Sequence, residues 1–318
     1  MPFHPDIAVR LPLLEGIPSL EAALSEPSMR AQMEAFDAYP EAPPPPPARP
    51  RMVLIPGPHG PVPVRIYTPE EHEDNSGHAF VWMHGGAFQF GDLDTNEADW
   101  TARQLAHRAN ATVISVDYRL AVEGVTYPVP LDDVVAAIRW LQANQDDLNV
   151  TSLSVGGASA GANLAAAAAL RLRDEEHWIP EHLILVYPMM HFDLPQPSES
   201  LRRALMELPS AMKLTPDMAR SVKESYLGTA DDVAVPGYAM PAGAELNGLG
   251  PTLVLNAEYD ELRASGEAFS ALLAASGVDV EQVKIPGMLH GFLNLPSAFA
   301  PVNDALERIA ARLRPRSQ

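Results

Sequence analysis

The feature that most constrains the fold is an alternation of short apolar runs with helical segments along most of the chain. Eight runs of apolar and β-branched residues have the length of strands: 52–55, 62–67, 79–83, 112–116, 153–155, 183–187, 252–256 and 280–285. Segments with apolar residues at helical spacing lie between or after them: 100–108, 131–141, 160–173, 264–275 and 302–313. Such alternation predicts an α/β fold with a mostly parallel sheet covered on both faces. The first two runs, joined by Pro-Gly-Pro-His-Gly-Pro, predict an antiparallel pair.

Two parts of the chain interrupt this alternation. Residues 1–40 have helical spacing broken by Pro18 and Pro27, which predicts two short helices. The prolines of 43–47 then predict a stiff, extended linker. Residues 191–248 contain no strand pattern, and their clearest helical segments are 198–208 and 215–226. A long insertion at the carboxyl edge of a parallel sheet is typical of a lid over a site.

Composition excludes several classes of function. A net charge of -19 argues against nucleic acid as a partner, because neutralising phosphates needs an excess of Lys and Arg. The chain has no cysteine, so disulfides, thiolate catalysis and thiolate metal sites are excluded. The first ten residues lack the pattern of a signal peptide, and no apolar run approaches the roughly 20 residues of a membrane span. We therefore expect a soluble, cytoplasmic protein.

The pentapeptide Gly157-Ala158-Ser159-Ala160-Gly161 is the motif that carries chemistry. It joins a predicted strand to a predicted helix, where Gly-x-Ser-x-Gly forms a strained turn that lifts the serine hydroxyl above the sheet. The motif lacks the Gly-Lys-Ser/Thr ending of a phosphate-binding loop. Ser159 is therefore our candidate nucleophile, and a purely structural glycine turn is the alternative.

A nucleophilic serine needs a base. Four histidines follow Ser159, namely His177, His182, His191 and His290. Only His290 lies in a loop between the last predicted strand and the last predicted helix, at the sheet's carboxyl edge. It is our candidate base, because the chain order in this type of fold is serine, acid, histidine.

The acid that orients the base should follow the preceding strand, and three carboxylates compete there. We favour Asp260, which lies 30 residues before the candidate base. Glu258 and Glu261 have a structural alternative, capping the loop or pairing with Arg263.

A developing oxyanion needs hydrogen-bond donors. His84-Gly85-Gly86-Ala87 follows the third strand, and its glycines allow backbone N–H groups to face a ligand. We expect the N–H groups of Gly85, Gly86 and Ala160 to form an oxyanion hole. The alternative is an ordinary loop.

Five motifs occur in the order found in the hormone-sensitive-lipase-like family of bacterial carboxylesterases, and the chain resembles that family over residues 40–315. They are His84-Gly85-Gly86-Ala87-Phe88, Asp117-Tyr118-Arg119-Leu120, Gly157-Ala158-Ser159-Ala160-Gly161, Asp260-Glu261-Leu262-Arg263 and His290-Gly291-Phe292. The resemblance implies an α/β-hydrolase fold with an eight-stranded sheet and a helical cap, and hydrolysis of short- to medium-chain esters. It implies Ser159, Asp260 and His290 as the catalytic triad, with no metal or other cofactor. Homodimers are frequent in the family, so a homodimer is one expectation.

The resemblance also implies how the chain is divided. Residues 1–45 and 191–248 would form the cap, and residues 46–190 and 249–318 the catalytic domain. His84 would support the oxyanion loop rather than act as a base. Arg119 and Asp133 would form a structural ion pair.

Two departures from the family pattern bear on the site. Ala158 stands where the family usually has Asp or Thr, so no side-chain hydrogen bond is expected behind the serine. Ala87 replaces the third glycine of the loop, and its methyl group narrows that loop against bulky substrates.

Two alternative functions use the same fold. An amidase or formamidase would use the same triad. A catalytically silent small-molecule receptor would lack the base, so the presence of His290 argues against it.

Overall fold

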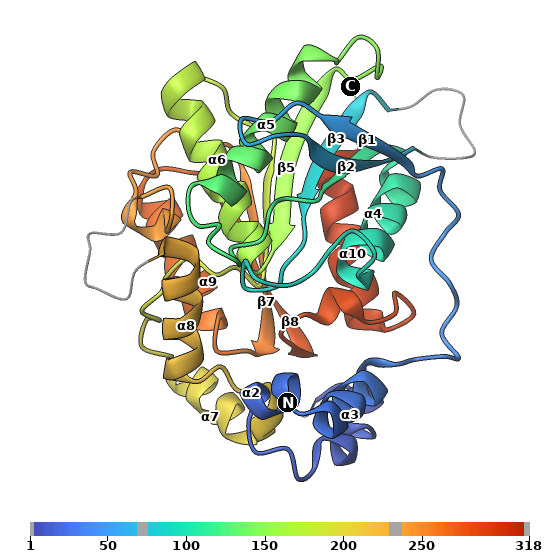
Figure 1. Cartoon of the computed structure of the whole chain (residues 1–318), viewed down its shortest axis with the longest axis vertical. Coiled ribbons are helices and arrows are strands. Elements are labelled where there is room, and N and C mark those ends of the chain that lie inside the picture. Colours follow the sequence, from blue (N-terminus) through green and yellow to red (C-terminus); the bar gives the residue numbers. More distant parts are fainter. Residues whose placement is uncertain (1–2, 69–75, 229–236, 315–318) are drawn as a thin grey trace.

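An eight-stranded sheet forms the centre of the protein (Figure 1), whose computed structural model describes residues 3–68, 76–228 and 237–314. The strands are β1 Arg51–Ile55, β2 Val62–Tyr67, β3 His78–Met83, β4 Thr112–Val116, β5 Ser152–Ala158, β6 Leu183–Val186, β7 Thr252–Tyr259 and β8 Val280–Leu289. Their order across the sheet is β1-β2-β4-β3-β5-β6-β7-β8. The pairs β1–β2 and β2–β4 are antiparallel and the others are parallel. The predicted fold class and the predicted antiparallel pair are therefore confirmed.

Helices cover both faces of this sheet (Figure 1). They are α1 Pro5–Ala8, α2 Leu20–Ser25, α3 Pro27–Asp37, α4 Asn96–Ala109, α5 Val129–Ala143, α6 Ala160–Glu176, α7 Glu199–Glu207, α8 Pro216–Leu227, α9 Arg263–Ala275 and α10 Ala300–Leu313. Short 3-10 helices are η1 Leu11–Leu14, η2 Ser210–Met212, η3 Pro241–Gly243 and η4 Phe292–Asn294. Helices α5, α6 and α9 pack on one face, and α4 and α10 pack on the other.

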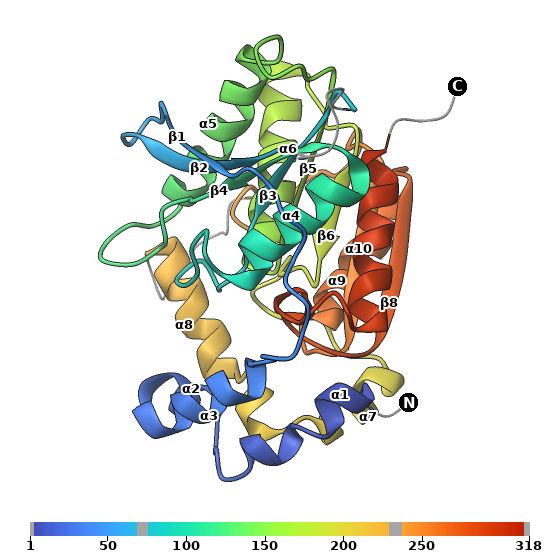
Figure 2. The same cartoon turned by 90° about the vertical axis from the view of Figure 1, so that its right-hand side faces the viewer.

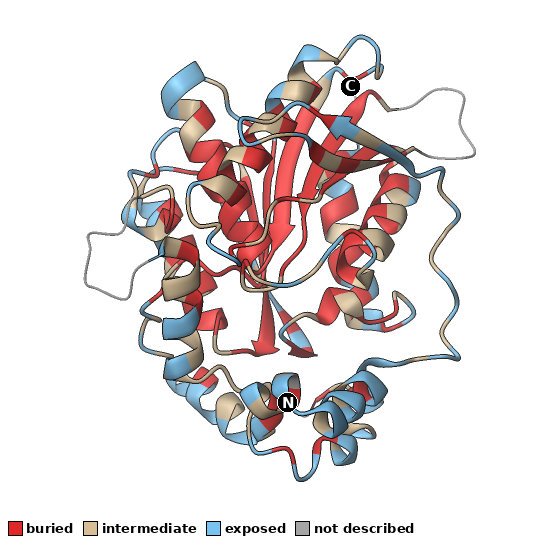
Figure 3. Ribbon diagram, in the orientation of Figure 1, coloured by how far each residue is buried: buried red, intermediate tan, exposed pale blue. Residues whose placement is uncertain are grey.

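Side-chain alternation along the strands creates one apolar core on each face. In β3, Val81 and Met83 join the core under α5 and α6, whereas Phe80 and Trp82 join the core under α4 and α10. The residues of β3 are buried on both faces, as expected for a central strand of a mostly parallel sheet (Figure 3). This double coverage gives the carboxyl edge of the sheet a rigid base.

The N-terminal segment has more helical pieces than the two that the sequence predicts. Four pieces are present, because Pro5, Pro12 and Pro27 each stand in the first turn of a helix, where the missing N–H costs nothing. Ser19 caps α2 by accepting a hydrogen bond from Ala22 N–H at 3.1 Å. Proline therefore starts helices here rather than only ending them.

The N-terminal helices and the helices of the 191–248 insertion lie together at one end of the molecule (Figures 1 and 2). Helix α2 packs on η2, and the Phe3 ring stacks on Tyr259 at the end of β7, with 4.0 Å between ring centroids. His4 N–H donates to the carbonyl of Gly287 at 3.0 Å. Both segments thus lie beyond the carboxyl ends of β7 and β8.

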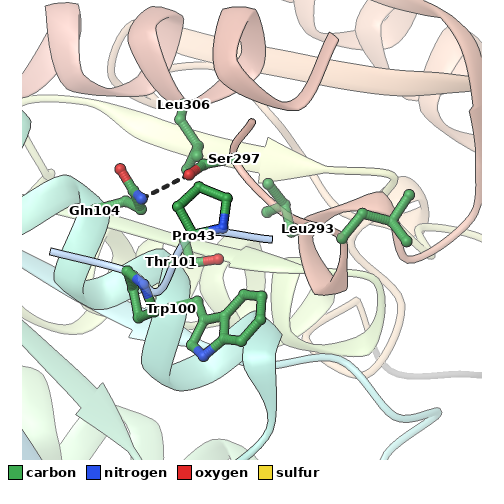
Figure 4. A pocket seen from close by; sticks show the side chains of 9 residues that line it. Pro43, Trp100, Thr101, Gln104, Leu293, Ser297 and Leu306 are labelled. Atoms are coloured by element: carbon green, nitrogen blue, oxygen red, sulfur yellow. Dashed lines mark hydrogen bonds between the residues drawn. The ribbon is translucent and has the colours of Figure 1, made fainter. Parts of the chain in front are cut away.

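The proline-rich linker returns the chain from this end to the sheet. Pro43 lies beside α4 and α10, where Gln104 donates a hydrogen bond to Ser297 Oγ at 2.7 Å (Figure 4). The cavity between Pro43, Trp100 and Leu306 has a volume of about 10 Å³. Such a space holds about one water molecule, so the linker packs closely against the domain.

A buried histidine at the amino edge of the sheet leads to a prediction about acid stability. His78 is 3% exposed, and its ring nitrogens lie 2.9 Å from Ser154 Oγ and 2.7 Å from Ser152 Oγ. Burial lowers the pKa of His78 from 6.5 to about 4. Between these values the unfolded chain binds a proton that the folded chain does not, so stability falls as the pH is lowered.

We expect this histidine to remove about 2 kcal/mol of unfolding free energy between pH 7 and pH 4.5. Urea unfolding gives the free energy of unfolding of wild type and of His78→Gln at pH 7 and at pH 4.5. The loss of this free energy between the two pH values in wild type, minus the loss in the variant, is the contribution of His78. Identical losses in the two proteins would contradict the prediction.

Candidate active site

Ser159 lies on a sharp turn between β5 and α6. Strand β5 lies in the middle of the sheet (Figure 1). Its backbone has φ 54° and ψ -116°, a strained conformation for a residue with a side chain. A Cβ atom on Gly157 would lie 2.3 Å from the Gly161 carbonyl oxygen, and one on Gly161 would lie 2.3 Å from that of His84. Only glycine fits at both positions, because any side chain there would collide with the backbone of the turn.

The loops after β7 and β8 bring the acid and the base to Ser159. The Nε2 atom of His290 lies 3.1 Å from Ser159 Oγ, and its Nδ1 atom lies 2.8 Å from Asp260 Oδ2. The second oxygen of Asp260 accepts the N–H of Leu262 at 2.9 Å, which fixes the carboxylate. The three residues predicted from sequence therefore form a continuous hydrogen-bonded chain.

Neighbouring carboxylates determine the direction in which the pKa of His290 is shifted. Burial acts against the charged ring, but the side chain keeps 38% exposure, and Asp260, Glu97 and Glu261 act in the opposite direction. Their combined effect raises the pKa of His290 above its usual value of 6.5. The arrangement thus favours the imidazolium that forms when the ring takes a proton from serine.

The other candidate bases occupy structural positions. His177 ends α6 in a left-handed conformation, and His182 donates its N–H to Ser154 Oγ at 3.2 Å. His191 Nδ1 lies 2.9 Å from Ser265 Oγ, on the α9 side of the sheet. None of these contacts involves Ser159.

Glu258 has partners other than His290, and the ion pair of Arg263 differs from the pairing offered as an alternative. Glu258 accepts hydrogen bonds from Lys284 and from the N–H of Gly287, which support the loop before His290. Arg263 forms its ion pair with Glu267 at 2.7 Å, one helical turn away in α9, and not with the carboxylate of Glu258 or Glu261. Its guanidinium also donates to the backbone carbonyl of Glu258 at 3.3 Å. A partner at i+4 on the same helix is available without any tertiary contact, which explains the difference.

The glycine-rich turn after β3 requires a correction to the predicted oxyanion hole. The N–H of Gly85 donates to the carboxylate of Glu97, so it is not free for a substrate. Gly86 and Ala87 follow with φ 115° and 53°. Within the described residues, no acceptor is found for the N–H groups of Gly86, Ala87 or Ala160. The turn therefore offers the N–H groups of Gly86 and Ala87 to a substrate, rather than those of Gly85 and Gly86.

This turn is supported from both sides. His84 Nδ1 donates to the Gly85 carbonyl at 2.6 Å, and the hydroxyl of Tyr118 donates to the His84 carbonyl at 2.9 Å. On the other side, Phe88 stacks on Tyr226 of α8 with 3.9 Å between ring centroids. The supporting position implied for His84 is thus observed, and α8 adds a contact that the sequence did not reveal.

The implied ion pair is also confirmed. The Arg119 guanidinium lies 2.5 Å from Asp133 Oδ1, and the Arg119 N–H donates to Oδ2 at 2.9 Å. Asp133 is fully buried in α5, so the pair fixes the loop after β4 to that helix. Ala158 is also fully buried and has no polar side chain to stabilise the turn behind Ser159.

Comparison with known proteins shows the family of the chain. The family described as alpha/beta hydrolase fold matches residues 80–294, which include the glycine-rich turn, Ser159, Asp260 and His290. The chain belongs to this family. Its resemblance to the hormone-sensitive-lipase-like carboxylesterases is thereby confirmed.

Individual relatives are similar over most of their length. The chain is 36% identical to carboxylesterase NlhH of Mycobacterium tuberculosis over 258 residues, 80% of this chain and 78% of that protein. It is 32% identical to an arylesterase of Saccharolobus solfataricus over 237 residues, 74% of each chain. A hyperthermophilic esterase from the archaeon Pyrobaculum calidifontis superposes with a TM-score of 0.81 at 32% identity, covering 99% of this chain and 98% of that one.

Proposed function

We propose that the protein hydrolyses carboxylic esters of short to medium acyl chain length through an acyl-enzyme on Ser159. Its family and its relatives make it a carboxylic ester hydrolase. The observation that carries the proposed mechanism is the chain of contacts from Ser159 Oγ to His290 at 3.1 Å and from His290 to Asp260 at 2.8 Å.

The proposed reaction has two steps. Ser159 Oγ attacks the ester carbonyl while His290 takes its proton, and the N–H groups of Gly86, Ala87 and Ala160 hold the oxyanion. The protonated His290 then gives the proton to the departing alcohol, which leaves an acyl-enzyme. Water repeats the sequence with His290 as base, and Asp260 keeps the imidazole in the required tautomer.

The charge state of His290 gives the reaction a predicted pH dependence. Only the neutral ring accepts the serine proton, and the nearby carboxylates hold the pKa of His290 above 6.5. We expect kcat/KM to fall roughly ten-fold for each pH unit below that pKa. A pH profile with p-nitrophenyl butyrate measures this acid limb. A limb with a midpoint below pH 6 would contradict the proposed electrostatics.

The residues beyond the carboxyl edge of the sheet supply the proposed cap. Residues 1–45 and 191–248 would cover the triad, while residues 46–190 and 249–318 would form the catalytic domain. The contacts of Phe3 with Tyr259 and of Phe88 with Tyr226 support this division. The first joins a cap segment to the end of β7, and the second joins a cap segment to the glycine-rich turn. The described part of the chain contains no helix long and apolar enough to cross a membrane. We also propose that the enzyme is located in the cytoplasm. We propose that it forms a homodimer, and light scattering measures its molecular mass in solution.

The acyl-chain preference is the direct test of the proposed substrate class. We expect kcat/KM with p-nitrophenyl esters to peak between acetate and octanoate and to fall at least about ten-fold by laurate. Matched anilides of the same acids test the amidase alternative, and we expect at least about 100-fold slower turnover. Faster hydrolysis of the anilides, or a peak at laurate, would contradict the proposal.

A further inference from the structure

Glu97 contacts two loops of the candidate site although it belongs to no catalytic motif. It stands in the first turn of α4 and is 6% exposed. One carboxylate oxygen accepts the N–H of Gly85, and the other accepts the hydroxyl of Tyr187 at 2.5 Å. A buried carboxylate is costly unless donors surround it, and here both donors come from loops of the candidate site.

The backbone of Glu97 is fixed as firmly as its side chain. Its N–H donates to Asn294 Oδ1 at 3.0 Å, in the short helix that follows His290. Its carbonyl accepts the indole N–H of Trp82, on β3, at 3.0 Å. Two hydrogen bonds to the carboxylate and two to the backbone, from different parts of the fold, therefore hold Glu97 in one place.

The first consequence concerns the oxyanion turn. Gly85 lies so close that a Cβ atom on it would be 2.8 Å from Glu97 Oε2 and 3.1 Å from Ser159 Cβ. Fixing the Gly85 N–H toward Glu97 limits how the next two peptides can turn. Gly86 can adopt its φ of 115° freely because it has no side chain. Ala87 has a left-handed φ of 53°, which is costly for a residue with a side chain and persists only when the surroundings enforce it.

The second consequence concerns the base. The Tyr187 ring, held by its hydroxyl on Glu97, packs edge to face against the His290 ring with 4.9 Å between centroids. The charged or titratable groups that face His290 are Asp260, Glu261, Glu97 and Tyr187. Glu97 thus contributes a fixed negative charge near the ring, from α4 rather than from the loop of the acid.

We propose that Glu97 is a positioning residue for ester hydrolysis, which orients the donors of the oxyanion turn and favours the protonated state of His290. The inference rests on the proposed esterase function. It predicts that the geometric and electrostatic roles can be separated by two conservative substitutions.

The first variant, Glu97→Asp, keeps the charge but shortens the side chain by one methylene, which withdraws the carboxylate from the Gly85 N–H. We expect kcat for p-nitrophenyl butyrate to fall about 100-fold, with KM within about three-fold of wild type, because the lost contact acts on the transition state. An alkyl trifluoromethyl ketone, which forms an oxyanion on serine, should inhibit this variant about 100-fold more weakly.

The second variant, Glu97→Gln, keeps the shape and can still accept the Gly85 N–H through its amide oxygen. We expect kcat on the pH plateau to stay within about ten-fold of wild type. The acid limb of kcat/KM should move to lower pH by at least about 0.3 pH unit, because a negative charge near His290 is gone. The matched control is Glu176→Gln, an exposed glutamate paired with Arg139, which should change neither quantity.

The outcomes are distinct. Circular dichroism and thermal melting show whether each variant is folded. If Glu97→Asp does not fold, the acid limb of Glu97→Gln alone tests the proposal. A folded Glu97→Asp with kcat within three-fold of wild type, or a Glu97→Gln acid limb that overlays that of wild type, overturns the proposal. Wild-type protein that turns over no ester refutes the proposed function itself.

Discussion

Replacing Ser159 with alanine is expected to lower kcat for p-nitrophenyl butyrate by at least about 10⁴-fold. The hydroxyl oxygen is the atom that bonds to the acyl carbon, and no other serine hydroxyl among the described residues hydrogen-bonds to His290. The fold should be unaffected, because alanine removes only an oxygen atom that is 3.1 Å from the base. Stopped-flow and overnight assays at equal protein concentration measure the loss.

The matched control for this variant is Ser200→Ala. Ser200 is exposed on α7, and among the described residues its hydroxyl hydrogen-bonds only to that of Ser198, so loss of the hydroxyl should leave kcat unchanged. Circular dichroism and melting temperature should match wild type in both variants. Retention of more than about 1% of wild-type activity by a folded Ser159→Ala would remove Ser159 from the mechanism.

Replacing Asp260 with asparagine is the second large effect, with an expected fall in kcat of about 10⁴-fold. The carboxylate of Asp260 accepts the Nδ1–H of His290, which leaves Nε2 free to take the serine proton. An amide group presents a donor to Nδ1, so the ring would adopt the other tautomer and donate from Nε2. The size of the packed side chain is unchanged, so the loss should appear without a large change in stability.

The neighbouring carboxylate provides the control for the choice of acid. Glu258→Gln should keep kcat within about five-fold of wild type, because Glu258 contacts Lys284 and Gly287 rather than His290. It should lower the melting temperature, since a buried group loses its charged hydrogen bonds. A larger loss of activity in Glu258→Gln than in Asp260→Asn would reverse the assignment of the acid.

The local part of the fold follows from the sequence. Residues 112–116 form β4 as predicted, because four of its five residues are β-branched. β5 and β7 continue beyond their predicted ends to Ala158 and Tyr259. Their last residues include glycine, alanine and glutamate, which have weak strand propensity and are held extended by their neighbours in the sheet.

The triad residues could be found because chain order and sheet topology together fix which loops meet. In a parallel sheet, the loops after β5, β7 and β8 all emerge at the carboxyl edge, so motifs 131 residues apart can be paired without coordinates. The ion pair of Arg119 and Asp133 was instead implied by the family resemblance, and the structure contains it.

Glu97 and the direction of the Gly85 N–H could not be found in this way. An acidic residue in the first turn of a helix is ordinary, because it interacts favourably with the helix dipole. Nothing in the sequence shows that its side chain turns back toward β3. A glycine-rich motif likewise indicates that N–H groups can face a ligand, but the position of a buried carboxylate decides which of them do.

The reactivity of Ser159 toward a fluorophosphonate is the most direct test of the account. We predict a single covalent adduct, mapped by mass spectrometry to the peptide that contains Ser159, with complete loss of esterase activity on labelling. Ser159→Ala should take up no label, and Asp260→Asn should be labelled far more slowly than wild type. Absence of an adduct in active wild-type protein, or an adduct at a different residue that abolishes activity, would contradict the assignment of Ser159 as the nucleophile.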